Sequence, residues 1–231
     1  MPSPNPTWKP GDKIETPAGQ MLTVDPSVIP ARDMYKLIIG AVVPRPIAFV
    51  STIGKDGTGN LAPYSFFNGV SSNPPCLMIS VSYKEDRSKK DTLRNIEETG
   101  QFVVNSANEW LIEPLVHCAG AYPYGVDEMS LVGLTPEPST RVRPPRVKES
   151  AVAFECETYK TVEIGDGSPG STTIIFGKIV FVHAHSSVYK NGRIDFSAYR
   201  PVGRLGGFGY GKITETFDIP VPIVGGQASG G

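Results

Sequence analysis

The chain has 231 residues, with 22 Lys and Arg against 23 Asp and Glu, so no net charge draws it toward nucleic acid or a membrane surface. It has no apolar run long enough to span a membrane, and its N-terminal stretch lacks the apolar core of a secretory signal. The three cysteines Cys76, Cys118 and Cys156 are widely spaced, without a CxxC pair. They predict buried thiols in a reducing cytoplasm, and not a disulfide framework or a zinc site.

The first 30 residues contain seven prolines, which exclude a helix or a central strand. They predict an extended arm that lies on the body or on a partner subunit. Residues 31–212 are expected to form one domain, and its many Gly and Pro residues separate short segments in a way that favours a β-rich fold. Residues 213–231 form an extension whose GGQASGG end predicts a flexible tail.

Six segments of this domain have the composition of β-strands. The first is apolar and β-branched, and the turn Lys55-Asp56-Gly57 leads from it into the second. The last two are long and flank Gly165–Gly170, a sequence typical of a hairpin loop. The six segments are Ile47–Ile53, Asn60–Phe66, Cys76–Tyr83, Phe102–Asn105, Ala151–Ile164 and Thr172–Val188.

Two helices are predicted between the strands. The first covers Thr92–Thr99, with Asp91 or its own first residue as the N-cap and Gly100 at its C-terminal end. The second runs roughly over residues 108–119, with its first residue as the cap, and Pro114 is expected to shorten or kink it. Because strands dominate and the helices are peripheral, a closed antiparallel barrel is favoured over an open sheet with exposed edges.

Two places in the sequence have the chemistry to bind an anion. Ser51 and Thr52 end the first predicted strand, and hydroxyls there can donate to phosphate oxygens, although a polar strand terminus explains them equally. Lys90-Asp91-Thr92 opens the first predicted helix, where unpaired N–H groups and the lysine charge favour an anion. The alternative is an ordinary capped surface helix, and the sequence does not distinguish Lys90 from Lys89.

The segment Asn60–Asn68, NLAPYSFFN, combines small, amide and aromatic residues. Small side chains let a flat ring approach the backbone, and amide groups can bond to the polar edge of such a ring. Phe66 and Phe67 are equally consistent with core positions. Ser65 and Phe66 are the preferred candidates for contact with a ring.

Two further motifs have plainer explanations. The glycines of Tyr199–Gly207 and Gly209 are spaced G-x-x-G-G-x-G, which is not the G-x-G-x-x-G of a dinucleotide-binding loop. His183 and His185 would lie on one face of a predicted strand. Since His117 is the only other histidine in the chain, they predict a satisfied pair and not a metal site.

These motifs, in this order, resemble those of the flavin reductase-like family of FMN-binding split barrels, over about residues 33–210. The most specific parts are N-x-A-P-x-S-F-F-N-G at residues 60–69 and K-D-T-L-R-N-I at residues 90–96. The resemblance implies a mainly β, antiparallel, Greek-key-like split barrel with a few peripheral helices, and a homodimer that binds FMN near the subunit interface. It also implies a set of FMN-contacting residues: Arg45, Pro46, Val50, Ser51, Thr52, Ser65, Phe66, Phe67, Asn68, Lys90, Asp91, Thr92 and Arg204.

The resemblance further implies an FMN-dependent oxidoreductase that takes hydride from NAD(P)H and passes electrons to free flavin, ferric ion or a partner oxygenase. Two alternatives stay open: an FMN enzyme that acts directly on an organic substrate, and a non-catalytic FMN-binding module. Hydride transfer needs no nucleophile or general base from the protein, so no catalytic residue is assigned.

Overall fold

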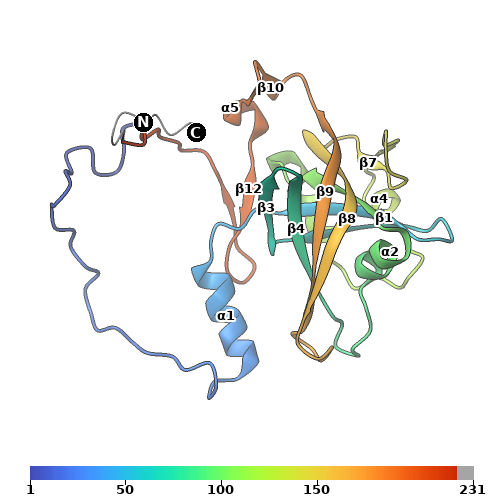
Figure 1. The fold of residues 1–231 in the computed structure, drawn as a ribbon, viewed down its shortest axis with the longest axis horizontal. Helices are drawn as coiled ribbons and strands as arrows, with labels where there is room; N and C mark the ends of the chain where they lie inside the picture. Colours follow the sequence, from blue (N-terminus) through green and yellow to red (C-terminus); the bar gives the residue numbers. More distant parts are fainter. Residues whose placement is uncertain (223–231) are drawn as a thin grey trace.

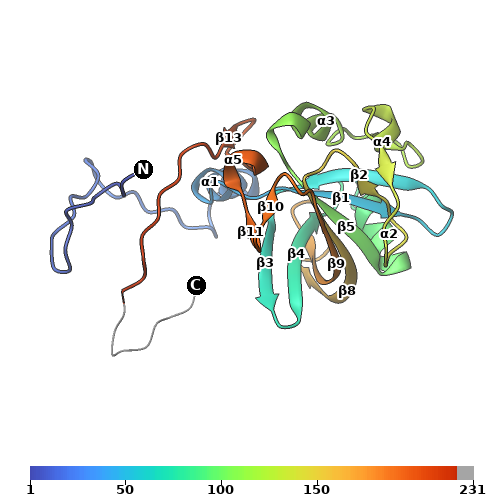
Figure 2. The same cartoon turned by 90° about the horizontal axis from the view of Figure 1, so that it is seen from above.

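The computed structural model describes residues 1–222, and its centre is a seven-stranded antiparallel sheet in the order β2-β1-β5-β8-β9-β4-β3. The edge strands β2 and β3 follow each other in the chain with only Ser65 and Phe66 between them, so the sheet curves until its two edges meet at this corner (Figures 1 and 2). The strands are β1 (Ala48–Ile53), β2 (Gly59–Tyr64), β3 (Phe67–Ser72), β4 (Pro75–Ser82), β5 (Gln101–Ser106), β8 (Val152–Ile164) and β9 (Thr172–Ala184).

Shorter elements surround this barrel. Three two-stranded ladders pair β6 (Pro136–Glu137) with β7 (Arg146–Val147), β10 (Tyr189–Lys190) with β11 (Arg193–Ile194), and β12 (Val202–Arg204) with β13 (Tyr210–Lys212). The α-helices are α1 (Ala31–Ala41), α2 (Asp91–Thr99), α3 (Ile112–His117), α4 (Glu128–Leu131) and α5 (Phe196–Tyr199). No helix within residues 1–222 is both long enough and apolar enough to cross a membrane.

Strand β1 lies between two hydrophobic clusters, because successive side chains of a strand point to opposite faces. Ala48 and Val50 pack into the barrel core, which α2 also joins. Phe49 packs on the other face, beneath the segments around α3 and α4. Both faces of β1 are therefore buried, and so are the polar residues at its end.

The prediction of a mainly β fold with peripheral helices is confirmed, and all six predicted strands are present within a few residues of their expected ends. Strand β3 is not among the six predicted strands, because its sequence FNGVSS is mostly exposed and lacks a regular apolar alternation. Helix α1 was not predicted either, since it buries only Ile39. The predicted buried, unpaired state of the three cysteines is confirmed.

The expected helix over residues 108–119 is present in a shortened form. It begins as a 3₁₀ turn, Glu109–Leu111, and continues as α3, with Pro114 in the first turn, where its missing N–H is not needed. Asn108 does not cap it, because its amide donates to Tyr199 O at 2.6 Å instead.

Two smaller expectations also need correction. The N-cap of α2 is Lys90, without a side-chain cap bond, whereas the predicted left-handed Gly100 at the other end is confirmed with a φ of 69°. His183 and His185 do not share a strand face, because β9 ends at Ala184. His183 Nε2 lies 2.6 Å from Glu155 Oε1, and His185 Nδ1 lies 2.7 Å from Ser187 Oγ.

Residues 1–30 contain no helix or strand and run in a wide arc away from the barrel before entering α1 (Figure 1). Apolar side chains along this arm remain exposed, including Met21 at 93% and Leu22 at 84%. The N-terminal amine donates to Thr216 O at 3.3 Å, which joins the arm to the C-terminal extension. The predicted flexible GGQASGG end lies outside the described residues.

Candidate functional site

A cleft of about 340 Å³ lies between the edge strand β2, the first residues of α2 and a loop that follows α3. Ala62, Pro63 and Tyr64 of β2 form one side of the cleft. Lys90-Asp91-Thr92 lies at its α2 end, and the loop Cys118–Tyr122 forms another wall. The cleft therefore brings together Ala62–Tyr64 and Lys90–Thr92, which lie about 30 residues apart in the sequence. Each belongs to a motif that the sequence analysis identified separately.

Lys90 places a cation at the open start of α2. Its side chain is half-buried, and its Nζ lies 5.8 Å from the centre of the Tyr64 ring. Within residues 1–222 no carboxylate lies within ion-pair distance of it. Burial, and then the charge of Lys84, lower the pKa of Lys90 below its usual value. A half-buried cation with no carboxylate partner among these residues, beside a helix start without a side-chain cap, is a site suited to an anion.

The neighbouring lysines are already paired, which separates the two candidates that the sequence left open. Lys89 Nζ bonds to Glu97 Oε2 at 2.6 Å on the outer side of α2, and this bond raises the pKa of Lys89. Lys84 Nζ lies 3.2 Å from Asp91 Oδ1. Of the three, Lys90 is the lysine free to meet a ligand.

The hydroxyls of Thr52 and Thr92 belong to a buried network beneath the start of α2. Asn60 Nδ2 donates to Thr92 Oγ1 at 2.9 Å, and Asn95 Nδ2 donates to Thr52 Oγ1 at 3.1 Å. Both threonines are at most 1% exposed. The network fixes α2 against β1 and β2, and so holds Lys90 at the edge of the cleft.

The sequence suggested that the hydroxyls at the end of β1 could donate to a phosphate. In the structure, these hydroxyls do not face the cleft. Ser51 is 1% exposed and donates to Pro145 O, and Val50 is a core residue with no exposure. The physical reason is that β1 is an inner strand with both faces covered. The orientation of these side chains does not support a direct phosphate contact by Ser51 or Thr52.

The remaining wall of the cleft is acidic and tightly packed. Glu128 is 6% exposed, and its Oε2 accepts a hydrogen bond from Leu61 N at 2.9 Å, which ties α4 to the edge of β2. Burial raises the pKa of this carboxyl. A Cβ on Gly120 would lie 2.7 Å from the Tyr122 ring, so only glycine lets that ring lie flat against the loop.

A second group of predicted residues lies around Arg45, at the corner that follows the last residue of β2. The Arg45 side chain is buried, donates to Ile39 O at 2.6 Å, Val42 O at 2.9 Å and Leu205 O at 3.0 Å, and bonds Ser65 Oγ at 3.2 Å through Nε. Its guanidinium carbon lies 6.0 Å from the centre of the Phe66 ring. Arg45 therefore fastens α1 and β12 to the barrel corner.

The side chains of Arg204 and Asn68, near the same corner, form hydrogen bonds with residues close to them in the chain. Arg204 donates to Gly207 O at 2.6 Å and Gly209 O at 3.2 Å, and its guanidinium lies over the Tyr210 ring. Asn68 is exposed and accepts from Gly69 N. Arg204 thus braces the β12–β13 hairpin.

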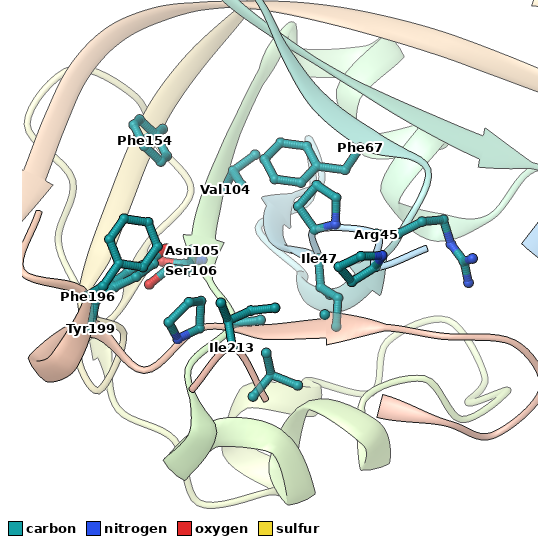
Figure 3. Close-up of a pocket in the computed structure, with 16 residues that line it drawn as sticks. Arg45, Ile47, Phe67, Val104, Asn105, Ser106, Phe154, Phe196, Tyr199 and Ile213 are labelled. Atoms are coloured by element: carbon teal, nitrogen blue, oxygen red, sulfur yellow. The ribbon is translucent and has the colours of Figure 1, made fainter. Parts of the chain in front are cut away.

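Pro46 and Phe67 line a separate cavity of about 300 Å³ beside Arg45 (Figure 3). The predicted residues therefore divide between the cleft along β2 and the corner that follows its last residue. The chain from Ala62 to Phe66 spans at most about 13 Å, so a ligand longer than one ring system could reach from one place to the other.

Several residues of the cleft are not identified by sequence reasoning. Lys84 and Glu128 carry no recognisable spacing, and the loop at residues 118–122 is composed mainly of Ala and Gly. Their role becomes visible only when the fold brings them to β2. The repeated small residues are the one signal that could have suggested a close approach by a ligand.

A model of the flavin reductase like domain matches residues 39–201. The chain belongs to the flavin reductase-like family. Nitrilotriacetate monooxygenase component B from Bacillus cereus is 36% identical, with a TM-score of 0.84 over 87% of this chain and 100% of that chain. The 2-nitrobenzoate 2-nitroreductase of Pseudomonas fluorescens is 33% identical, with a TM-score of 0.79 over 90% and 100% of the two chains.

The expected split barrel is confirmed by this likeness. A protein from Shewanella frigidimarina, described as a flavin reductase with a split barrel domain, shares the fold with a TM-score of 0.73 over 85% of this chain and 96% of its own, at 23% identity. Family membership supports a flavin cofactor. The cleft fits such a group: its small residues leave room beside β2 for a flat ring, and Lys90 and the free start of α2 provide donors for a phosphate.

Proposed function

We propose that the protein is an FMN-dependent oxidoreductase that takes hydride from NAD(P)H. The observation that carries the proposal is the unpaired, half-buried Lys90 at the uncapped start of α2, in a cleft lined by the Ala62–Tyr64 edge. A phosphate is the anion that a helix start with an adjacent lysine binds well. FMN ends in a free phosphate monoester, whereas in FAD this phosphate is joined to AMP through a pyrophosphate bond, so the cleft favours FMN.

In this proposal the protein mainly positions the cofactor and excludes water. When bound, the flavin would supply the ring that accepts hydride from the nicotinamide. Lys90 and the N–H groups of the first turn of α2 hold the phosphate, while Ala62, Pro63 and Tyr64 support the rest of the molecule. Tyr122 and the loop at residues 118–122 shield the cleft from solvent.

The test is an anaerobic reduction assay with FMN-loaded protein and either NADH or NADPH. Rapid loss of the absorbance of oxidised flavin, much faster than for free FMN, supports the reductase. No reaction with either nicotinamide would reject it and leave a flavin-binding module.

The electron acceptor is proposed to be free flavin, ferric ion or a partner oxygenase. The oxygenase is supported by the 36% identical structure, which is described as component B of a monooxygenase. We also propose a homodimer with the flavin near the subunit interface, supported by the exposed apolar side chains of the arm. The three free thiols support the expected cytoplasmic location.

A second candidate is direct reduction of an organic substrate. It is favoured by the aromatic cavity beside Arg45 and by the 33% identical relative, which is described as a nitroreductase. Oxidation of reduced flavin in the protein by a nitroaromatic compound, without added free flavin or partner, would support it.

A further inference from the structure

The cavity of about 300 Å³ beside Arg45 lies outside the cleft at Lys90 and has a different character. Its walls come from the segment before β1, the ends of β3 and β5, the start of β8, and α5 with β12. Four aromatic rings line it, with Phe67 on the side toward Arg45 and Phe154, Phe196 and Tyr199 on the other side (Figure 3). This lining is suited to a flat ring, since aromatic side chains gain from stacking or edge contacts with another aromatic group.

The cavity offers no charge to a ligand. Arg45 is the one ionisable side chain besides Tyr199 in its wall, and its guanidinium points away from the cavity toward its own bonds with backbone carbonyls (Figure 3). A charged ligand would lose its hydration here without gaining a partner. The ligand should therefore be uncharged.

The polar groups of Asn105 and Ser106 in the wall have partners within the protein. Asn105 donates to Phe49 O at 3.0 Å and accepts from Val147 N at 2.9 Å. Ser106 Oγ donates to Asn108 Oδ1 at 2.7 Å and accepts from Val152 N at 3.0 Å. Burial raises the pKa of Tyr199, and a hydrogen bond with Ser106 opposes this rise without cancelling it, so the phenol stays protonated. Its hydroxyl can exchange the bond with Ser106 for one that it donates to a ligand.

We infer that this cavity binds an uncharged planar aromatic molecule with a hydrogen-bond-accepting carbonyl, of the chemical class of quinones, which stacks among the aromatic rings and accepts a bond from the Tyr199 hydroxyl. Phe196, which is 55% exposed, lies where the ligand meets solvent. Arg45 connects the cavity to Ser65 and Phe66, the predicted neighbours of the flavin ring.

The role of this ligand as electron acceptor rests on the proposed function. One quinone takes up two electrons and two protons, equivalent to the hydride of NAD(P)H and one proton from water, and leaves as the hydroquinone while NAD(P)⁺ is formed. Binding of the quinone itself does not depend on the flavin.

The test is calorimetric titration of the flavin-free full chain with menadione, an uncharged naphthoquinone, and with naphthoquinone sulfonate as its charged counterpart. We expect one saturable site for menadione and none for the sulfonate. Tyr199→Phe should weaken menadione binding about three- to tenfold, the size of one hydrogen bond, and Phe196→Ala should weaken it as well. Phe208→Ala is the matched control, because Phe208 is 97% exposed and outside the cavity.

The inference would be overturned if menadione bound equally to the wild type and all three variants, or if it showed no saturable binding. It would also be overturned if the sulfonate bound as well as menadione. A second copy of the chain is the competing occupant. Protection of the cavity walls from hydrogen exchange in an oligomer that does not bind menadione would assign the cavity to that copy. Titration with FMN on the same samples separates the two proposals: FMN binding without menadione binding rejects only the quinone site, and the reverse rejects only the flavin site.

Discussion

At the scale of single residues, Lys90 holds a charge where burial opposes it. Because burial lowers the pKa of Lys90, the free protein loses this charge at a lower pH than an exposed lysine would. A bound phosphate favours the charged form, so phosphate binding and protonation of Lys90 should be linked.

This linkage predicts how FMN affinity depends on pH. As pH rises through the lowered pKa of Lys90, the wild type should lose its preference for FMN over riboflavin, because Lys90 loses its proton. Lys90→Arg should keep the preference over this range, since arginine stays charged. Fluorescence titrations with both flavins would measure this, with Lys89→Arg as the control. An identical decline in Lys90→Arg would mean that another group carries the effect.

Glu155 is a second residue whose charge has a structural task. Its side chain is fully buried, and its carboxylate accepts from Thr140 N and Arg141 N, each at 2.6 Å, as well as contacting His183. Burial alone would raise the pKa of Glu155. The bonds from Thr140, His183 and Arg141 outweigh it, and the net pKa is lowered. The residue thus fixes the loop before β7 to β8.

Glu155→Gln should reduce the free energy of unfolding by about 2–4 kcal/mol at neutral pH, because an amide cannot accept all these bonds. Since the pKa of the folded state is lowered, the contribution of Glu155 is complete above the unfolded value of about 4.3 and is lost as pH falls through the folded value. Urea unfolding at pH 7 and at decreasing pH below 5 measures this. The wild type and the variant should converge in acid, and a constant difference would contradict the account.

At the scale of elements, the loop at residues 118–122 shapes the cleft through one close contact. Gly120→Ala would force a Cβ into the Tyr122 ring and move that ring. We expect FMN affinity to fall several-fold while the barrel stays folded.

A double-mutant cycle isolates this contact. In a Tyr122→Ala background the Gly120→Ala change should have little further effect on FMN binding, because the ring that it displaces is gone. An undiminished loss in that background would show that the loop acts through something other than the ring.

Most helices and strands could be predicted from the sequence where an apolar pattern or a turn residue marks them clearly. β1, β4 and the β8–β9 hairpin have apolar patterns and clear turn residues, and Gly100 marks the end of α2. By contrast β3 and α1 bury little, so their sequences do not carry the periodicity of a buried face. Lys90 could be found from the sequence because any helix start has unpaired N–H groups that favour an anion. The direction of the Ser51 hydroxyl could not, because it depends on which segments of the fold cover β1.

At the scale of the whole molecule, the arm at residues 1–30 exposes apolar side chains that contact little of its own subunit. We expect the full chain to sediment as a dimer, and removal of residues 1–29 to weaken the dimer while leaving the far-ultraviolet circular dichroism of the barrel intact. Analytical ultracentrifugation over a range of concentrations measures this. A monomeric full chain, or equal dimer stability after truncation, would contradict the proposed role of the arm.

The central claim for the whole molecule is that it holds a flavin by its phosphate at Lys90. The most direct measurement compares the dissociation constants of FMN and riboflavin for wild type, Lys90→Ala and Lys89→Ala. The account predicts that the wild type prefers FMN, that Lys90→Ala weakens FMN binding by about 1.5–3 kcal/mol with little effect on riboflavin, and that Lys89→Ala changes neither. Equal affinity of the wild type for FMN and riboflavin, or the same loss in Lys89→Ala, would contradict it.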